Sequence, residues 1–343
     1  MSHKGKGSKL TLALENLDNL PAMPEIARQL LALKLDTEAG EKQMLCLIER
    51  DPQLSAKIVG MANSPVMRLQ RRINSIHDAA IFLGIEALKS VAIGMALMSK
   101  MSHKATKYFD PHDLWAHSVT IAISMNLLTE AMPERIRPNE SQTFLTGLLH
   151  DIGLMALHHF DHEASDELHH QLLLQPKRPI CEIEMELFGI THNAIGEELT
   201  RHWNLPQEII EAVGLHHSPR QNYYALSNSL AKMISIAERL LSNFGIAEHT
   251  NNPISDSEWL DLGIDVLKTK NLIALINEMA IQVAQLPETF EPFHYAEIQI
   301  EAAPIAQPVL PQAVSKVFPP ANAGIFSTIF AWFNKVLFCK YYS

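Results

Sequence analysis

The chain of 343 residues is long enough to bury a large core and to form two domains. Its hydrophobic content of 47% predicts a globular protein and excludes a largely disordered one. A formal net charge of −10 argues against non-specific nucleic-acid binding, which depends mainly on the neutralisation of phosphates.

Cysteine usage and the N-terminal residues indicate a cytoplasmic protein. The three cysteines (Cys46, Cys181 and Cys339) are far apart and form no CxxC pair, which is typical of a reducing compartment. Residues 1–10 are polar and basic with no apolar segment behind them, so we predict no signal peptide. No stretch approaches the roughly 20 apolar residues of a membrane-spanning helix.

Helical periodicity runs through most of the chain, and no segment alternates as a strand does, so we predict an all-α fold. In the first part we expect helices from Pro24-Glu25, over Glu41–Arg50, from Asp51-Pro52 (N-cap and first turn), over Ile76–Leu83 after the cap Ser75, and over Ile85–Met101. Gly84 is expected to end the fourth of these helices.

The second part continues in the same style, with short connections. We expect a helix that Asp110-Pro111 caps and that reaches about Met132, followed by helices over Pro138–Leu157, Glu163–Leu174, Ile180–Phe188, Thr191–Trp203, Pro206–His216, Tyr223–Phe244 and Val266–Ala284. Prolines from Pro287 onward predict a linker. The terminal residues 325–342 predict either a short amphipathic helix, docked on a partner, the core or a membrane surface, or a loosely packed tail.

The most informative motif is His150-Asp151-Ile152-Gly153, because a histidine next to an aspartate offers two metal ligands. His150 falls over Gly147, where a small residue allows a close approach of another helix. The helical phase also places His117 on the buried face of the helix after Asp110.

Three other helices also bring an imidazole or a carboxylate to an apolar face: His192 lies with Ile195 and Leu199, Glu238 with Ile234, and His216-His217 close a helix. A shared metal would satisfy all of these groups, and a hydrogen-bond network among them is the alternative. The pairs His158-His159 and His169-His170 are interpreted as solvated faces or helix ends.

These residues carry a family resemblance. His117, His150-Asp151 and the late Ala237-Glu238 resemble the HD superfamily of metal-dependent phosphohydrolases. The chain is more closely similar to the HDOD domain, a bacterial signalling relative of that superfamily. Further matching segments are Leu20-Pro21-Ala22-Met23-Pro24, Ile48-Glu49-Arg50-Asp51-Pro52, Ala62-Asn63-Ser64-Pro65, Leu114-Trp115-Ala116-His117-Ser118 and Trp203-Asn204-Leu205-Pro206.

The resemblance implies a two-lobed helical domain over residues 13–245, with an N-terminal lobe over about 13–105 and an HD-like lobe over about 106–245. A leader over 1–12, a helical extension over 246–290 and a Pro-rich tail over 291–343 would surround it. It also implies divalent metal (Fe, Mn, Ni or Mg) in a mono- or binuclear centre. His117, His150, Asp151 and Glu238 would hold one ion, and Asp151, His192, His216 and His217 would hold a second.

The sequence departs from active relatives at three places. Leu154 stands where active HDIG enzymes usually place a lysine, Glu238 stands where an aspartate is usual, and the Gly-Tyr-Pro signature of cyclic di-GMP phosphodiesterases is absent around His192. These departures favour a regulatory signal-transduction module with weak or no catalysis, acting on signalling proteins in trans or sensing a nucleotide. An active phosphodiesterase or nucleotidase is the alternative.

A third hypothesis concerns nucleic acid. The segment 51–84 places a helix, a break and a second helix around Arg68, Arg71 and Arg72, which loosely resembles a two-helix element for DNA recognition. A packing corner with a solvated basic loop explains the same pattern, so nucleic acid is not an expected partner.

Overall fold

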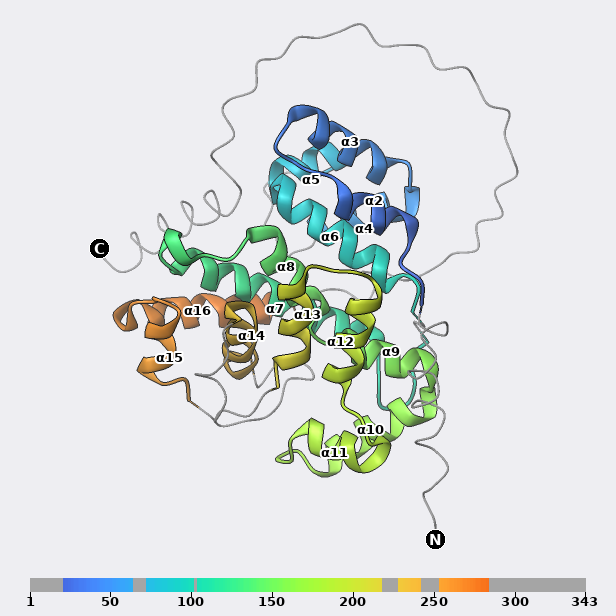
Figure 1. Ribbon diagram of the computed structural model, residues 1–343, viewed down its shortest axis with the longest axis vertical. Coiled ribbons are helices and arrows are strands. Elements are labelled where there is room, and N and C mark those ends of the chain that lie inside the picture. Colours follow the sequence, from blue (N-terminus) through green and yellow to red (C-terminus); the bar gives the residue numbers. More distant parts are fainter. Residues whose placement is uncertain (1–20, 64–71, 102–103, 218–227, 242–252, 284–343) are drawn as a thin grey trace, which may run out of the picture.

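The computed structural model describes residues 21–63, 72–101, 104–217, 228–241 and 253–283, and every regular element in these ranges is helical (Figure 1). The all-α prediction is therefore confirmed. The first lobe contains α2 (Glu25–Ala32), α3 (Glu38–Glu49), α4 (Pro52–Ala62), α5 (Ile76–Leu83) and α6 (Ile85–Met98).

Local capping signals set the ends of these helices. The Asp51 carboxylate accepts hydrogen bonds from the backbone N–H groups of Gln53 and Leu54, each at 3.0 Å, and Pro52 occupies the first turn of α4. Ser75 caps α5 in the same way, and Gly84 ends it with a positive φ of 81°. All three signals act as the sequence predicts.

The second lobe is built around α7 (Pro111–Ala131), which is buried along most of its length. The later helices of this lobe are η3 (Glu134–Ile136), α8 (Glu140–Leu149), α9 (Ile152–Phe160), α10 (His162–Leu174), α11 (Ile180–Phe188), α12 (His192–His202), α13 (Gln207–Leu215) and α14 (Ser229–Leu240). Of these, α8 and α14 pack on α7, whereas α10 packs on α9 and α11, and Figure 1 shows α10 and α11 at the end of the molecule away from the first lobe. Helix α6 of the first lobe packs on α8, where Ser90 donates to the carbonyl of Ser141 at 2.8 Å.

The prediction of a single helix over Pro138–Leu157 is wrong, because the helix is interrupted at His150 and Asp151, between α8 and α9. Asp151 leaves the helical region with φ −100° and ψ 19°. In a continuous helix two successive side chains point about 100° apart around the axis. The interruption lets the side chains of His150 and Asp151 face the same buried volume. Hydrophobic periodicity in the sequence does not predict such an interruption.

The pair His158-His159 lies in the last turn of α9, as the helix-end interpretation has it, but the interpretation of His158 and His169 as solvated is wrong, because both are buried. Together they enclose Phe109, with ring centroids 4.6 and 4.5 Å from it. The Nε2 atom of His158 donates to the carbonyl of Lys104 at 2.7 Å. These histidines therefore hold the segment that joins the two lobes.

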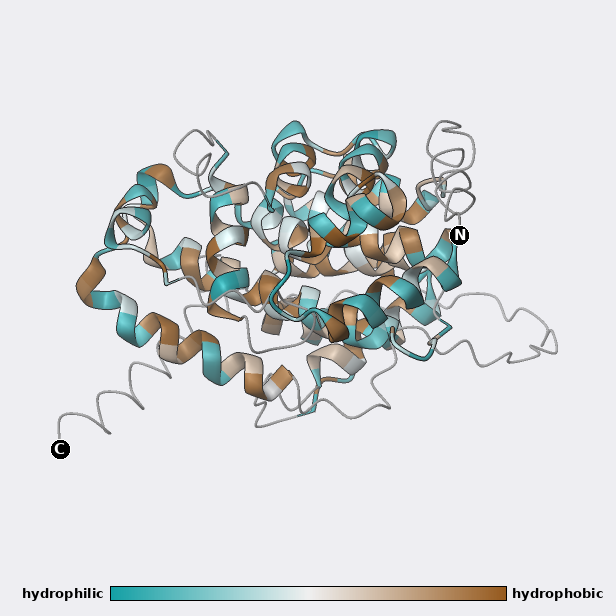
Figure 2. Cartoon of the chain, turned by 90° about the horizontal axis from the view of Figure 1, so that it is seen from below, coloured by the Kyte–Doolittle hydropathy of each residue, from teal (hydrophilic) through white to brown (hydrophobic). Residues whose placement is uncertain are grey.

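A helical extension follows, with α15 (Asp256–Asp261), which the sequence reading missed, and α16 (Val266–Val283). Helix α16 packs on α7, and Arg239 of α14, whose side chain is 7% exposed, donates to Glu258 of α15 at 2.6 Å. In Figure 2 the outer helices carry both hydrophilic and hydrophobic residues, as expected of amphipathic packing. The expected leader and the Pro-rich tail lie outside the described residues.

Within the described ranges, no single helix is both long and apolar enough to cross a membrane. Helices α5 and α6 reach that length and hydropathy only jointly, across a bend of 117°.

Candidate metal centre

All seven ligand candidates converge in the second lobe. They come from α7, α12 and α14 and from the ends of α8 and α13, and Figure 1 shows where these helices lie. They form two groups that share Asp151. Site A contains His117, His150, Asp151 and Glu238, and site B contains Asp151, His192, His216 and His217. Whether these residues bind an ion remains a prediction.

Site A is a cluster of two imidazoles and two carboxylates. The Nε2 atoms of His117 and His150 lie 3.2 Å apart, and Oε1 of Glu238 lies 3.0 and 2.8 Å from them, respectively. The Oδ2 atom of Asp151 is 3.5 Å from His117 and 3.2 Å from His150. Glu238, at 8% exposure, is the most exposed of the four residues.

Site B uses the other oxygen of the same aspartate. The Oδ1 atom of Asp151 lies 3.3 Å from Nε2 of both His192 and His216, which are 3.2 Å from each other. The ring of His217 stands edge-on to His192, with centroids 4.8 Å apart. Asp151 therefore presents one oxygen to each site, as a bridging ligand does.

Helix ends fix the ring orientation of two of these histidines. The Nδ1 atom of His150 donates to the carbonyl of Gly147 at 2.8 Å, and that of His216 donates to Val213 at 2.6 Å. A carbonyl only accepts, so each Nδ1 carries a proton. In the neutral ring the Nε2 lone pair then points into the centre, which is the arrangement that a metal ligand requires.

Glu184 is a buried carboxylate beside the centre that the sequence reading missed. It is 0% exposed, and its two oxygens accept from Nδ1 of His192 at 2.8 and 2.9 Å. A signal was present, because Glu184 lies midway between Ile180 and Phe188 at helical spacing on the buried face of α11.

The charges in the centre strongly perturb its titration. Burial opposes the protonation of His150, but the carboxylates of Asp151 and Glu238 outweigh it and raise its pKa to about 10. Burial likewise opposes the protonation of His192, and Glu184 and Asp151 raise its pKa to about 10. Burial opposes the ionisation of Asp151, but the positive charge of His150 and hydrogen bonds from His150, His192 and His216 outweigh it and hold the pKa of that carboxyl well below its usual range.

The donor set fits a divalent ion. The Oδ1 atom of Asp151 is buried and accepts no hydrogen bond of good geometry from the described residues, although two imidazoles face it. If both rings are neutral, the Nε2 lone pairs of His192 and His216 point at the carboxylate oxygen and repel it. A metal cation, or a proton on Nε2, must therefore lie between the rings and Oδ1. Ligand atoms about 3 Å apart are expected around an ion bound at about 2.1 Å.

Close backbone contacts set the spacing of the ligand helices. A Cβ atom on Gly153 would lie 1.9 Å from the carbonyl oxygen of His192, and one on Gly147 would lie 2.4 Å from Cα of Ala122. Glycine is therefore required where α9 meets α12 and where α8 meets α7. The close approach predicted at Gly147 is confirmed.

The comparisons with known proteins decide the family. A family model described as the HDOD domain matches residues 20–219, which is more than half of the chain and ends before Glu238. The chain belongs to the HDOD family. A protein provisionally named as a signal transduction protein, from Marinobacter aquaeolei VT8, is 24% identical with a TM-score of 0.69, over 82% of this chain and 65% of that one.

Other HDOD-like structures share the fold. An HDOD domain protein of unknown function from Geobacter sulfurreducens is 24% identical with a TM-score of 0.65, over 82% of this chain and 99% of that one. A provisionally named phosphohydrolase from Shewanella amazonensis SB2B is 21% identical with a TM-score of 0.60, over 82% and 98% of the two chains. A curated Treponema pallidum protein, itself uncharacterised, is 23% identical over 60% of this chain. The matched region spans only 40% of the length of the Treponema protein.

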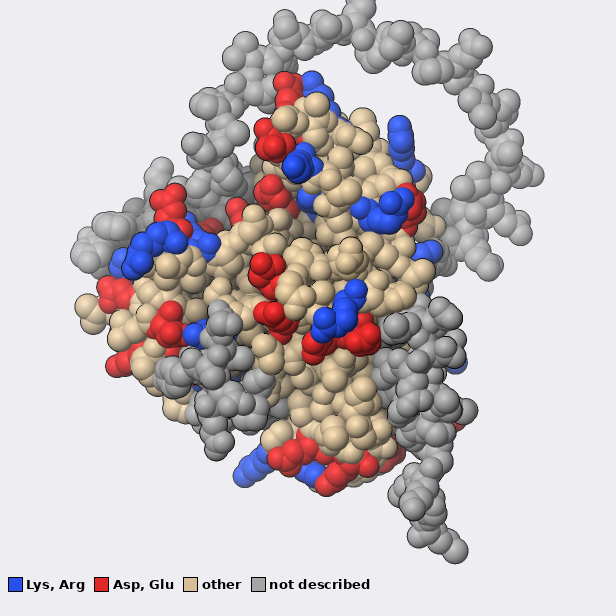
Figure 3. Space-filling model, in the orientation of Figure 1, with Lys and Arg blue, Asp and Glu red and all other residues tan. Residues whose placement is uncertain are grey.

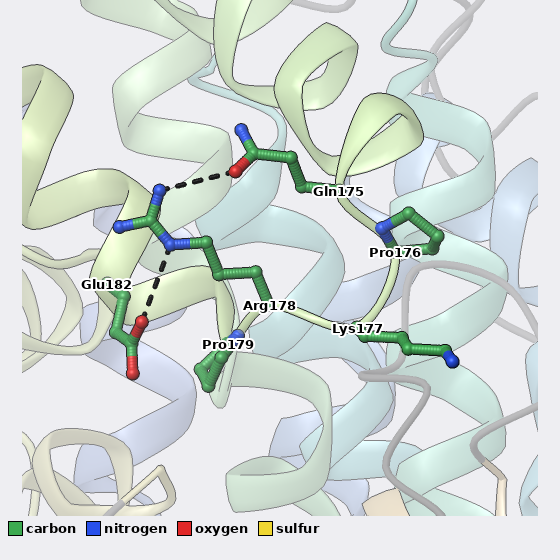
Figure 4. A pocket seen from close by; sticks show the side chains of 6 residues that line it. All are labelled: Gln175, Pro176, Lys177, Arg178, Pro179 and Glu182. Atoms are coloured by element: carbon green, nitrogen blue, oxygen red, sulfur yellow. Dashed lines mark hydrogen bonds and ion pairs between the residues drawn. The ribbon is translucent and has the colours of Figure 1, made fainter.

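Two surface features lie apart from the centre. An open hollow of about 610 Å³ lies where α10 turns into α11, with Arg178 held against Gln175 and Glu182 (Figure 4). None of the seven ligand candidates lines it. Acidic and basic side chains are interspersed on the face in Figure 3. Arg68 and Arg71 of the nucleic-acid hypothesis lie outside the described residues.

Proposed function

We propose that the chain is a bacterial signal-transduction module whose HD-like centre holds divalent metal and turns substrate over weakly or not at all. The single observation that carries the metal is the placement of Asp151, whose two oxygens each face a pair of imidazole Nε2 atoms within 3.5 Å. A buried carboxylate surrounded by four imidazoles is a costly arrangement for a purely structural core.

Iron and manganese suit the donor set best, because imidazoles favour transition metals and carboxylates favour harder ions. His117, His150, Asp151 and Glu238 would hold one ion, and Asp151, His192, His216 and His217 the other. An ion there would polarise a phosphoryl oxygen and acidify water.

Two features support a regulatory role over efficient catalysis. Leu154 is 1% exposed and part of the apolar core, so no cation follows Gly153 to meet a phosphate. The candidate ligands also expose little surface, whereas a catalytic centre needs a coordination position open to substrate. The signal would then be transmitted as a change in how the chain binds signalling proteins, which are separate polypeptides acting in trans.

The phosphohydrolase alternative has its own support, because the ligand set is complete for two ions. Metal content and hydrolysis separate the two functions. Protein purified without chelator would be compared with His150→Ala, and with His202→Ala as an exposed histidine at the end of α12.

Near-stoichiometric metal that is lost only in His150→Ala, without hydrolysis of a chromogenic phosphodiester, supports the proposal. Hydrolysis that disappears with His150→Ala replaces it with the enzyme. Absence of metal from the wild-type protein, even after added Mn²⁺, overturns the metal centre.

A further inference from the structure

One imidazole of site B is held by a carboxylate that is not itself among the predicted ligands. Glu184 reaches from the middle of α11 to the first residue of α12 and accepts hydrogen bonds from two N–H groups of His192. The ring Nδ1–H is shared between both carboxylate oxygens, at 2.8 and 2.9 Å, and the backbone N–H donates to Oε2 at 3.0 Å. Both residues are buried, at 0% and 1% exposure.

This contact fixes the ring in three respects. The carboxylate holds the proton on Nδ1, so Nε2 of His192 is left to face Oδ1 of Asp151 and Nε2 of His216. The bond from the backbone N–H anchors the Glu184 carboxylate at the start of α12, directly behind the ring. A carboxylate behind a ligand imidazole also raises its basicity, which strengthens its bond to a cation.

The histidines of the centre differ in this support. His150 of site A and His216 of site B donate Nδ1–H to neutral backbone carbonyls, whereas His192 of site B donates to a buried carboxylate. A buried carboxylate is expensive to keep unless a positive charge compensates it. An ion on Nε2 of His192 would supply that charge through the ring.

We propose that Glu184 is the positioning residue for a second ion in site B, which makes the centre binuclear. This inference rests on the proposed metal centre and adds the occupancy of site B and the residue that tunes it.

A rival arrangement places an ion among Cys181, Glu184 and His192, whose ligand atoms also lie close together. That ion would need the Nδ1 lone pair of His192, and Nδ1 already lies within hydrogen-bond distance of both Glu184 oxygens. The geometry therefore favours Glu184 as a hydrogen-bond acceptor behind site B.

The test is a titration of the chelator-treated full chain with Mn²⁺, by calorimetry and by electron paramagnetic resonance. The wild type is expected to bind two ions and to give the signal of a coupled pair. Glu184→Gln should keep the ion of site A and bind the second ion about 10–100-fold more weakly, without the coupled signal. Retained binding at site A shows that the variant is folded.

Two matched controls accompany it. Glu186→Gln makes the same change two residues away on α11, where the side chain is 64% exposed and pairs with Arg178. Cys181→Ser removes the sulfur of the rival arrangement. Both should titrate as the wild type does.

Several outcomes overturn the inference while leaving site A intact as a proposal. These are unchanged binding of two ions by Glu184→Gln, equal weakening of both ions, or loss of the second ion in Cys181→Ser. A wild type that binds no Mn²⁺ contradicts the metal centre itself, so the two failures are distinguishable.

Discussion

The Nε2 atom of His150 lies 3.2 Å from Oδ2 of Asp151, although the two residues are neighbours in sequence. Adjacent side chains in a helix diverge, so this contact exists only because α8 ends before His150 and α9 starts after Asp151. The break also frees Oδ1 of Asp151 to face His192 and His216. One interruption of the helix thus places Asp151 where it can serve as the ligand that sites A and B share.

The shared aspartate predicts an unequal effect of two isosteric substitutions. Asp151→Asn should weaken Mn²⁺ at both sites, because each site loses an anionic oxygen. Glu238→Gln should weaken only site A, which alone contains Glu238. Both losses should be at least the roughly 10–100-fold seen when an outer partner is removed. Calorimetric titration measures them, and equal effects of the two variants would contradict the bridging role.

The pKa values of His150 and His192 predict how stability depends on pH in metal-free protein. Both folded-state values are raised from 6.5 to about 10, so the folded chain binds more protons than the unfolded chain between these limits. This contribution is complete below about pH 6.5 and is lost as the pH rises toward 10. Thermal unfolding with chelator present should show Tm falling by several degrees from pH 7 to 9.5.

Metal should reverse this trend, because protons and the ion compete for the same Nε2 atoms. The stabilisation by saturating Mn²⁺ is expected to grow as the pH rises through this range. A metal-free Tm that increases from pH 7 to 9.5 would show that the carboxylates do not hold protons on these two rings.

Gly153→Ala should disturb the centre from outside the ligand set. The added methyl would collide with the carbonyl of His192, so α9 and α12 must separate. Overpacking of this kind costs about 1–3 kcal/mol or more, and site B should lose affinity with it. Gly60→Ala, at an exposed position of α4, is the control and should be neutral or stabilising by up to about 1 kcal/mol. Urea unfolding and Mn²⁺ titration check both variants.

Leu154→Lys should not create an active enzyme, although it introduces the residue type usual at that place. Leu154 is enclosed by the apolar core, so the variant would bury an unpaired ammonium. The expected result is a loss of several kcal/mol of stability with no gain in phosphodiester hydrolysis. Measured hydrolysis by a folded Leu154→Lys protein would instead favour the phosphohydrolase alternative.

Periodicity and capping could predict much of this molecule. Asp51-Pro52, Ser75 and Asp110 mark helix starts with side chains that accept backbone hydrogen bonds, and they do so in the structure. His117 falls on a buried face because it keeps the three-and-four spacing of its apolar neighbours. The convergence of the seven ligand candidates followed from this phase together with the family pattern.

Three other features could not be predicted, or were missed although a weak signal was present. Neither glycine nor proline stands at His150 or Asp151, where α8 ends, so one helix over residues 138–157 is predicted. Glu184 went unnoticed because an acidic residue among other glutamates reads as part of a solvated face. Helix α15, at Asp256–Asp261, is too short to establish a period.

The hydrogen bonds of His150 and His216 to Gly147 and Val213 have a consequence for how fast an ion could bind. Each imidazole closes the last turn of its own helix, so forming α8 and α13 also selects the tautomer and aims the lone pair. The metal-free chain is then already arranged for coordination, with little conformational entropy left to lose. The rate of metal association would be limited by the removal of protons and water from the ligands. Fraying of the end of α8 or α13 would release the ring and lower the affinity for the ion before it changed the fold.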